Sequence, residues 1–273
     1  MARHRRHAGS PMPVAAVVLA ALGVVFVALP LVGLLWRVPW SRVGSVLGEE
    51  STLTALRLSL VCSLGATVIA AVLGVPLAWL LARVPFRGSS VVRALATLSM
   101  VLPPVVGGVA LFAALGRRGL VGQYLDSWFG IRLPFTTAGA MVAQAFVAMP
   151  FLVVTVEAAL RQADTRYEDA ARTLGASRGR VFWRVTLPSV RSALGAGLVL
   201  AWARALGEFG ATITFAGNFP GTTQTLPLAV YLTLESDTGA GLVLAALMML
   251  VSFAVLVGLR GRWLRRDLVG VAA

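Results

Sequence analysis

The chain has 273 residues, of which 58% are hydrophobic, and its mean hydropathy is +0.84. Soluble domains hold roughly 45–50% apolar residues, so this composition excludes an ordinary soluble protein and indicates a membrane protein. The formal charge of +13 rests on 24 arginines, and because these stand in short clusters between apolar runs, they indicate membrane topology rather than a nucleic-acid-binding face.

Six apolar runs follow one another along the chain, each long enough for the ~20 residues that a helix needs to cross a bilayer. The first run follows an arginine-rich start, but it lacks a small-residue cleavage pattern and is too long for a signal peptide. We therefore predict an all-α integral membrane protein of six transmembrane helices, with spans near Pro13–Trp36, Thr54–Ala82, Val91–Leu115, Thr137–Leu160, Ser192–Phe215 and Gly239–Leu259.

The arginines are divided unequally between the loops. With a cytoplasmic N-terminus, seventeen arginines fall inside and five outside, while Arg57 and Arg204 lie within spans. Cytoplasmic loops carry the excess of basic residues, so a multi-pass protein of the cytoplasmic membrane with both termini in the cytoplasm is predicted.

The residue types that usually carry chemistry are scarce. Cys62 is the only cysteine, so no internal disulfide and no thiolate metal cluster can form. His4 and His7 belong to the basic N-terminal tail, where a solvated flank is expected rather than a metal site. No span carries His with Glu at metal-ligand spacing or a Ser with a plausible base, so neither a catalytic nor a metal site is predicted.

The loop between the fourth and fifth predicted spans is too polar to cross the membrane and carries helix signals. Thr165 and Glu168, three residues apart, fit a capping box, and Gly175 suits the left-handed residue that ends a helix. A short helix near Arg166–Leu174 is therefore predicted, with a small Ala170-Ala171 surface that fits another protein's groove.

A second stretch of the loop, Arg178–Val185, is amphipathic at helical spacing. Pro188 is expected in the first turn of the following span, a position that tolerates the missing amide hydrogen. The whole loop is thus predicted to be a mechanical lever on the membrane surface.

This loop resembles the E-A-A, three residues, G, nine residues, I-x-L-P motif of bacterial ABC importer permeases. Asp169 stands for Glu and Val185 for Ile, and each keeps the charge or the apolar character. The resemblance implies the type I ABC importer permease fold, in which the short helix docks into a cleft of a cytoplasmic ATPase. The residues that it assigns to ATPase coupling are Glu168, Asp169, Ala170, Ala171, Arg172, Gly175, Val185, Leu187 and Pro188.

The fifth predicted span contains two charges, Arg204 and Glu208, on one helical face. Ionisable groups near mid-membrane cost about 2.5–3.5 kcal/mol each, so they normally face a bundle interior or a wet cavity. One interpretation is a structural ion pair that fixes packing. The other is a pathway for an anion, in which Glu208 holds Arg204 in place. The residues predicted to border this pathway are Arg204, Glu208, Thr212, Thr214 and Asn218.

The cargo follows from resemblance only. The run Gly207–Phe215 with Asn218, and the run Met100–Gly108, resemble molybdate importer permeases more closely than sulfate or thiosulfate permeases. The similarity spans roughly residues 50–260 and implies a molybdate permease that also accepts tungstate. A permease for sulfate, thiosulfate or another oxyanion stays open, as do a secondary transporter, for which no inverted repeat is seen, and a membrane-embedded enzyme.

ATP must be bound by another polypeptide, because the sequence has no lysine and no phosphate loop of the form G-x-x-x-x-G-K-[ST]. The resemblance implies a cytoplasmic ABC ATPase dimer that binds ATP and Mg, an extracellular or periplasmic oxyanion-binding protein, and a second copy of this chain that completes a pore in the lipid bilayer. No cofactor of the chain's own is expected. The predicted division is residues 1–53 for the N-terminal tail, first helix and external loop, 54–260 for the permease core, and 261–273 for a cytoplasmic tail.

Overall fold

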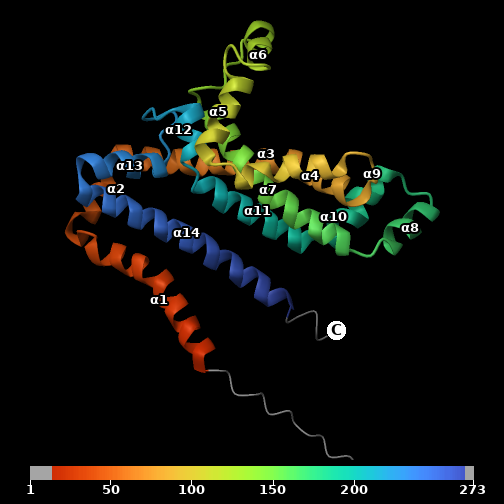
Figure 1. Cartoon of the computed structure of the whole chain (residues 1–273), viewed down its shortest axis with the longest axis horizontal. Coiled ribbons are helices and arrows are strands. Elements are labelled where there is room, and N and C mark those ends of the chain that lie inside the picture. Colours follow the sequence, from red (N-terminus) through yellow and green to blue (C-terminus); the bar gives the residue numbers. More distant parts are fainter. Residues whose placement is uncertain (1–13, 268–273) are drawn as a thin grey trace, which may run out of the picture.

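The computed structural model describes residues 14–267, and every regular element in this part of the chain is a helix. Three helices form the body of the bundle and pack against one another: α3 (Glu50–Arg83), α7 (Thr137–Gln162) and α11 (Arg191–Leu206) (Figure 1). The predicted all-α class is confirmed. The arginines and histidines of the N-terminal tail lie outside the described residues, as does the end of the C-terminal tail from residue 268.

The other helices surround this body (Figure 1). α1 leans away from the rest of the chain and touches α14, and α4 packs on α7. The helices that surround α3, α7 and α11 are α1 (Val14–Arg37), the 3₁₀ turn η1 (Trp40–Arg42), α2 (Val43–Gly48), α4 (Ser89–Val101), α5 (Pro104–Leu115), α6 (Gly122–Phe129), α8 (Arg166–Thr173), α9 (Arg178–Val181), the π-helical turn η2 (Phe182–Thr186), α10 (Leu187–Ser189), α12 (Gly210–Ala216), α13 (Leu226–Ser236) and α14 (Thr238–Asp267).

Within the described residues, four helices are long and apolar enough to cross a membrane by themselves: α1, α3, α7 and the Thr238–Val255 part of α14. A fifth such span, α11, arises if it is joined to the bent segment before it. The third and fifth runs that the sequence predicted as spans are each split into two helices. The chain is therefore multi-pass, but its spans are not six continuous helices.

The break in the third run lies at consecutive prolines. Leu102 and Pro103 are extended, and Pro104 starts α5 at a position where its missing amide hydrogen costs nothing. The prediction of one helix over Val91–Leu115 was wrong because a proline disfavours helical backbone in the residue before it.

The break in the fifth run separates α11 from α12 at residues 207–209. Gly207 and Phe209 leave helical geometry, and α12 restarts at Gly210. A further bend of 77° separates the Arg178–Ser189 segment from α11. The single helix predicted over Ser192–Phe215 is thus two helices with a charged residue, Glu208, at their junction.

The core is built largely from small residues. On α3, Ala66, Ala70 and Ala78 are fully buried against α7 and α11, in one cluster with larger side chains such as Leu152. A Cβ added to Gly197 on α11 would lie 2.8 Å from Leu152 Cδ1 and 3.4 Å from Leu152 Cα, so glycine lets α11 approach α7 this closely without a shift of the Leu152 side chain. Such close approach is the usual basis of helix packing in membranes, where apolar burial alone gives little driving force.

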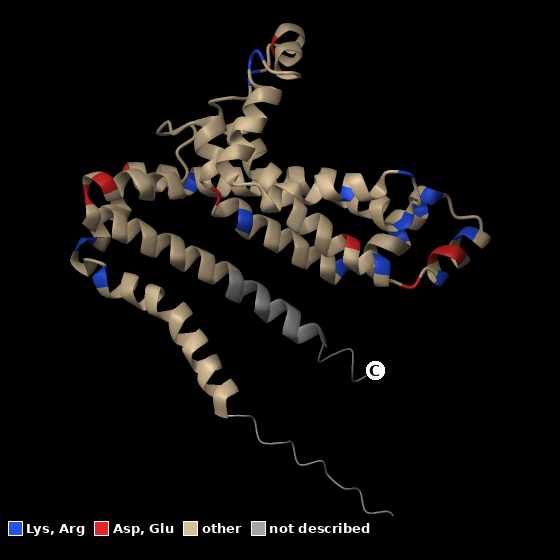
Figure 2. Cartoon of the chain, in the orientation of Figure 1, with Lys and Arg blue, Asp and Glu red and all other residues tan. Residues whose placement is uncertain are grey.

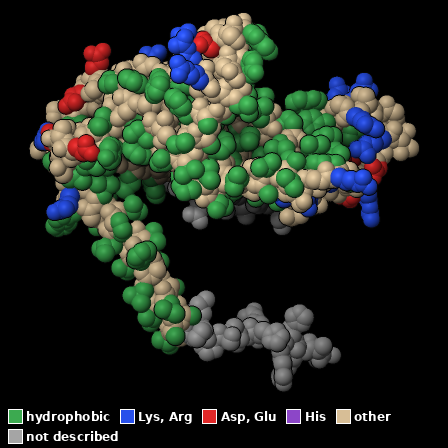
Figure 3. Space-filling view, turned by 45° about the horizontal axis from the view of Figure 1, so that its top comes forward, with side chains coloured by type: hydrophobic (Ala, Val, Ile, Leu, Met, Phe, Trp, Pro, Cys, Tyr) green, Lys and Arg blue, Asp and Glu red, His purple; other side chains and the backbone are tan. Residues whose placement is uncertain are grey.

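The surface agrees with a membrane environment. Charged residues gather at the two ends of the bundle and at the projecting α6 tip, with few elsewhere (Figure 2). Apolar side chains cover much of the face between these ends (Figure 3). Phe26 on α1 and Val68 on α3 are 78% and 61% exposed, which fits helices that face lipid or another membrane subunit.

Candidate functional site

The predicted lever lies at one end of the bundle, where α8 projects beyond the ends of α3 and α7 (Figure 1). Its helix runs from Arg166 to Thr173, as the sequence predicted within one residue. The capping-box prediction was wrong: the Thr165 side chain makes no capping bond, and Asp164 Oδ1 instead accepts from the Arg166 amide at 2.9 Å. Glu168 is thereby free to make a different contact.

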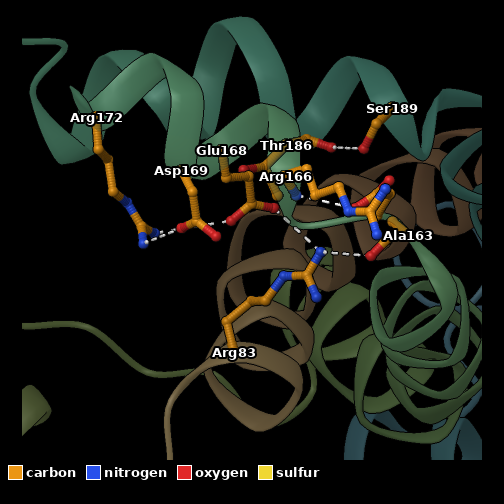
Figure 4. Close-up of polar contacts among 9 residues, drawn as sticks. Arg83, Ala163, Arg166, Glu168, Asp169, Arg172, Thr186 and Ser189 are labelled. Atoms are coloured by element: carbon orange, nitrogen blue, oxygen red, sulfur yellow. Dashed lines mark hydrogen bonds and ion pairs between the residues drawn. The ribbon is translucent and has the colours of Figure 1, made fainter. Parts of the chain in front are cut away.

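Glu168 turns inward and is buried, with 4% of its surface exposed. Its Oε1 accepts from Arg83 Nη2 at 3.1 Å, and its Oε2 lies 3.7 Å from Arg172 Nη2 (Figure 4). Arg83 is the last residue of α3 and also donates to the carbonyl oxygen of Ala163 at 3.3 Å. The first turn of α8 is thus tied to the ends of both α3 and α7.

The outward face of α8 carries the other motif residues. Asp169, Ala170 and Arg172 are exposed, Ala171 is half-buried, and Arg172 Nη1 lies 3.3 Å from Asp169 Oδ1. Gly175 has a φ of +82°, which confirms the predicted left-handed helix end. Of the two adjacent carboxylates, Asp169 therefore faces outward and Glu168 inward.

Two large apolar side chains extend this outward face. Tyr167 and Leu174 flank the Asp169–Arg172 turn and are 72% and 88% exposed. Exposed apolar side chains next to charged ones are typical of a protein contact surface, and a neighbouring indole, Trp183, is also exposed.

The second half of the loop, residues 178–189, packs against α3 and leads into α11. Val181 is buried, and the Phe182 ring meets Trp79 of α3 edge to face at 5.8 Å between centroids. The amphipathic helix predicted over Arg178–Val185 is a short α9 followed by a π-helical turn. Pro188 was predicted in the first turn of the fifth span. This was wrong, because Pro188 lies in α10, before the 77° bend that precedes α11. Val185 and Leu187 are half-buried.

A second polar cluster lies beside the first. Glu157 of α7 is buried, and its Oε1 accepts from Arg93 Nε at 2.8 Å and from Arg161 Nε at 3.0 Å. Both arginines also donate to the carbonyl oxygen of Leu81 in the last turn of α3, at 3.4 and 3.2 Å. Sequence reasoning missed Arg83, Arg93 and Glu157. Glu157 carried a signal, since it is an ionisable residue inside a predicted span.

The break between α11 and α12 brings Arg204 and Glu208 together. Glu208 is 1% exposed; its Oε2 pairs with Arg204 Nη1 at 2.5 Å, and its Oε1 accepts from the Ala211 amide at 2.8 Å. The carboxylate thus satisfies an otherwise unpaired amide at the start of α12. The Arg204 side chain keeps 28% of its surface exposed.

The other predicted pathway residues lie on α12 and just after it. Thr212 is fully buried, and its Oγ1 has no hydrogen-bond partner in the described structure. Thr214 Oγ1 donates to the carbonyl oxygen of Gly210 at 2.8 Å, as a hydroxyl does within a helix. The amide oxygen of Asn218 is buried without a partner, and so is the whole amide of Gln144 on α7, which sequence reasoning missed.

Within the described range, no group of three or more His, Cys, Asp or Glu side chains is arranged to hold a metal ion. The buried carboxylates of the described residues, Glu157, Glu168 and Glu208, each pair with arginine instead.

Comparison with known proteins finds a family whose model matches most of the chain. Residues 70–269 match the family described as "Binding-protein-dependent transport system inner membrane component". The chain is 47% identical over 243 residues to the molybdenum transport system permease protein ModB of Mycobacterium tuberculosis, covering 89% of this chain and 92% of that protein. It is 42% identical to ModB of Escherichia coli K12, with coverages of 78% and 93%.

A sulfate permease matches at lower sequence identity, and a solved ABC transporter shares the fold. The sulfate transport system permease protein CysT of E. coli K12 is 34% identical over 221 residues, with coverages of 81% and 79%. Among solved structures, a bacterial ABC transporter that imports alginate superposes with a TM-score of 0.73 at 17% identity, covering 92% of this chain and 95% of that chain.

Proposed function

The chain belongs to the family of binding-protein-dependent transport system inner membrane components, and on this premise we propose that it is the channel-forming permease subunit of an ATP-driven molybdate importer. The observation that carries the cargo is the 47% identity to a molybdenum transport permease over 89% of the chain, against 34% to a sulfate permease. Tungstate, a tetrahedral dianion like molybdate, is proposed as a second cargo.

The coupling proposal rests on the outward face of α8. This face presents Asp169, Ala170, Tyr167 and Leu174 at the arginine-rich end of the bundle, beyond the last turns of the spanning helices. Small residues in the middle allow close approach, while Tyr167, Leu174 and the charged side chains supply contact area and charged hydrogen bonds. We assign this face to the docking of a cytoplasmic ABC ATPase.

ATP and Mg are bound by that ATPase, and the permease itself has no catalytic role. The sequence has neither a lysine nor a phosphate loop to hold a nucleotide. A second copy of the chain completes the pore, both termini lie in the cytoplasm, and an external oxyanion-binding protein delivers the cargo. ATP binding favours one conformation of the assembly and so shifts the permease between inward and outward access.

The residues at the break between α11 and α12 are proposed to border the anion pathway. Arg204 is the part-exposed cation there, and Glu208 fixes its position while capping α12. Discontinuous helices in transporters are tolerated where they line a cavity, because released backbone groups find partners there. Thr212, Thr214 and Asn218 border the same segment and supply polar atoms without added charge.

A competition assay tests the cargo. The full chain, co-expressed with its partner ATPase and binding protein, is reconstituted in proteoliposomes, and uptake of labelled molybdate is measured with unlabelled molybdate, tungstate or sulfate in excess. Molybdate and tungstate are expected to suppress the signal and sulfate to leave it nearly intact. Equal suppression by sulfate would make the protein a general oxyanion permease and would overturn the molybdate assignment.

A further inference from the structure

Arg83 lies where the ends of three helices, α3, α7 and α8, meet. It is not part of the loop motif that resembles ABC importer permeases. It ends α3, donates from one Nη2 atom to both Glu168 of α8 and the Ala163 carbonyl at the end of α7, and keeps only 13% of its side chain exposed (Figure 4). Its Nε is buried without a partner. The guanidinium therefore depends on these two acceptors.

The last turn of α3 is held from a second side as well. Arg93 of α4 and Arg161 of α7 both donate to the Leu81 carbonyl, two residues before Arg83, and both pair with Glu157. Free carbonyls at a helix C-terminus attract cations. The end of α3 is thus fixed to α4 and α7, and Arg83 extends this fixed region to α8.

Apart from the Arg83–Glu168 contact, α8 is held by two short connections and by packing on α9 and η2, about which it can pivot. Only residues 163–165 join it to α7, and only residues 174–177 join it to α9. A pivoting helix would absorb a push from a docked partner instead of passing it on. Among the described residues, the Arg83–Glu168 pair is the ion pair between α8 and a long spanning helix.

We infer that Arg83 and Glu168 are positioning residues, a coupling link that makes α8 and α3 move together, and that Asp169, not Glu168, is the carboxylate presented to the ATPase. This inference rests on the proposed function, because it assigns the route by which the ATPase moves the permease. Glu168 acts through Arg83 and touches neither cargo nor nucleotide.

Two readouts test the link with the variants Arg83→Gln and Glu168→Gln, their double variant and the conservative Arg83→Lys. The matched control is Arg87→Gln, which removes an exposed arginine four residues away with no described partner. The first readout is amide hydrogen exchange in α8 of the full chain in lipid nanodiscs. The second is molybdate imported per ATP hydrolysed by the whole complex.

Each single Gln variant is expected to raise α8 exchange about tenfold, the factor that corresponds to about 1.4 kcal/mol, and to lower molybdate imported per ATP several-fold. The double variant is expected to be no worse than either single one, since both remove the same contact. Arg83→Lys keeps the charge and is expected to fall in between, and Arg87→Gln to match the wild type.

Arg83→Gln with unchanged α8 exchange and unchanged import per ATP would overturn the inference. So would a loss of ATPase co-purification in Glu168→Gln but not in Arg83→Gln, because Glu168 would then contact the ATPase itself. If Arg83→Gln fails to fold, Arg83→Lys and Glu168→Gln are measured instead. Unchanged α8 exchange and unchanged import per ATP in Glu168→Gln would then overturn the inference. Failure of the wild type to import molybdate would refute the proposed function alone, because the exchange readout needs no cargo.

Discussion

Two regions of the molecule hold a short helix with an arginine and a buried carboxylate, and they do so over different sequence distances. At α12, Arg204 and Glu208 are four residues apart, and Glu208 also binds the Ala211 amide. At α8, Arg83 reaches Glu168 across 85 residues. A local contact fixes the shape of one segment, whereas a contact between distant segments makes two segments move together. The first suits a fixed pathway element and the second suits a lever.

Of the variants that test this comparison, Arg204→Ala is expected to lower the stability of the permease most. It leaves the Glu208 carboxylate, which is 1% exposed, without its cation, and breaking a buried pair in this way costs about 3–5 kcal/mol. Thermal unfolding of the purified permease in detergent is expected to show a clearly lowered midpoint.

The matched control is Arg204→Leu combined with Glu208→Gln, which removes both charges and keeps an acceptor for the Ala211 amide. This variant is expected to recover most of the stability and none of the transport. Near-normal uptake by a well-assembled Arg204→Ala complex would remove Arg204 from the pathway and leave it a purely structural role.

Glu157→Gln is expected to have an intermediate effect on stability. It weakens charged hydrogen bonds from Arg93 and Arg161, each worth about 1.5–3 kcal/mol, but these side chains are 36% and 51% exposed and can turn to water. Unfolding in detergent measures the change, with Glu50→Gln, an exposed glutamate at the other end of α3, as the control. A loss as large as that of Arg204→Ala would show that the cluster is more enclosed than its exposure indicates.

The helical class, the short helix near Arg166–Leu174 and the Gly175 turn could be predicted because hydropathy, helix-end residues and a glycine in a left-handed turn are local properties. The direction of Glu168 could not, since its partner Arg83 is far away in sequence. From the sequence alone, a glutamate three residues after Thr165 fits a capping box as well as it fits an inward contact. The breaks at Pro103-Pro104 and Glu208 were missed because apolar runs were treated as unbroken helices, although the prolines were visible.

Arg172→Ala tests the outward side of α8 and is expected to change little. Its contacts with Glu168 and Asp169 are 3.7 and 3.3 Å long, and the arginine side chain is 52% exposed. Such surface helix pairs contribute about 0.3–0.5 kcal/mol. Hydrogen exchange in α8 is expected to rise less than threefold, and a rise equal to that of Arg83→Gln would contradict the distinction between an inward link and an outward face.

The projecting tip around α6 gives the smallest predicted effect, a response to acid. Hydrogen bonds from Arg132, then Arg117, lower the pKa of Asp126 below its ordinary 3.8. A lowered pKa means that the stabilisation is complete above pH 3.8 and is lost as pH falls through the folded-state value. Fluorescence of Trp128, an exposed residue of α6, is expected to stay constant from about pH 7 to pH 5 and to change only in stronger acid, and the acid step is expected to vanish in Asp126→Asn.

The central claim is that a separate cytoplasmic ATPase drives this permease through α8. Its most direct test is labelled molybdate uptake into proteoliposomes that hold the full chain, partner ATPase and binding protein, with ATP, with a non-hydrolysable analogue, or with an ion gradient alone. Accumulation against a gradient only with hydrolysable ATP, and its loss in Asp169→Asn, is the predicted result. Concentrative uptake driven by the ion gradient without ATP would contradict the claim and indicate a secondary transporter.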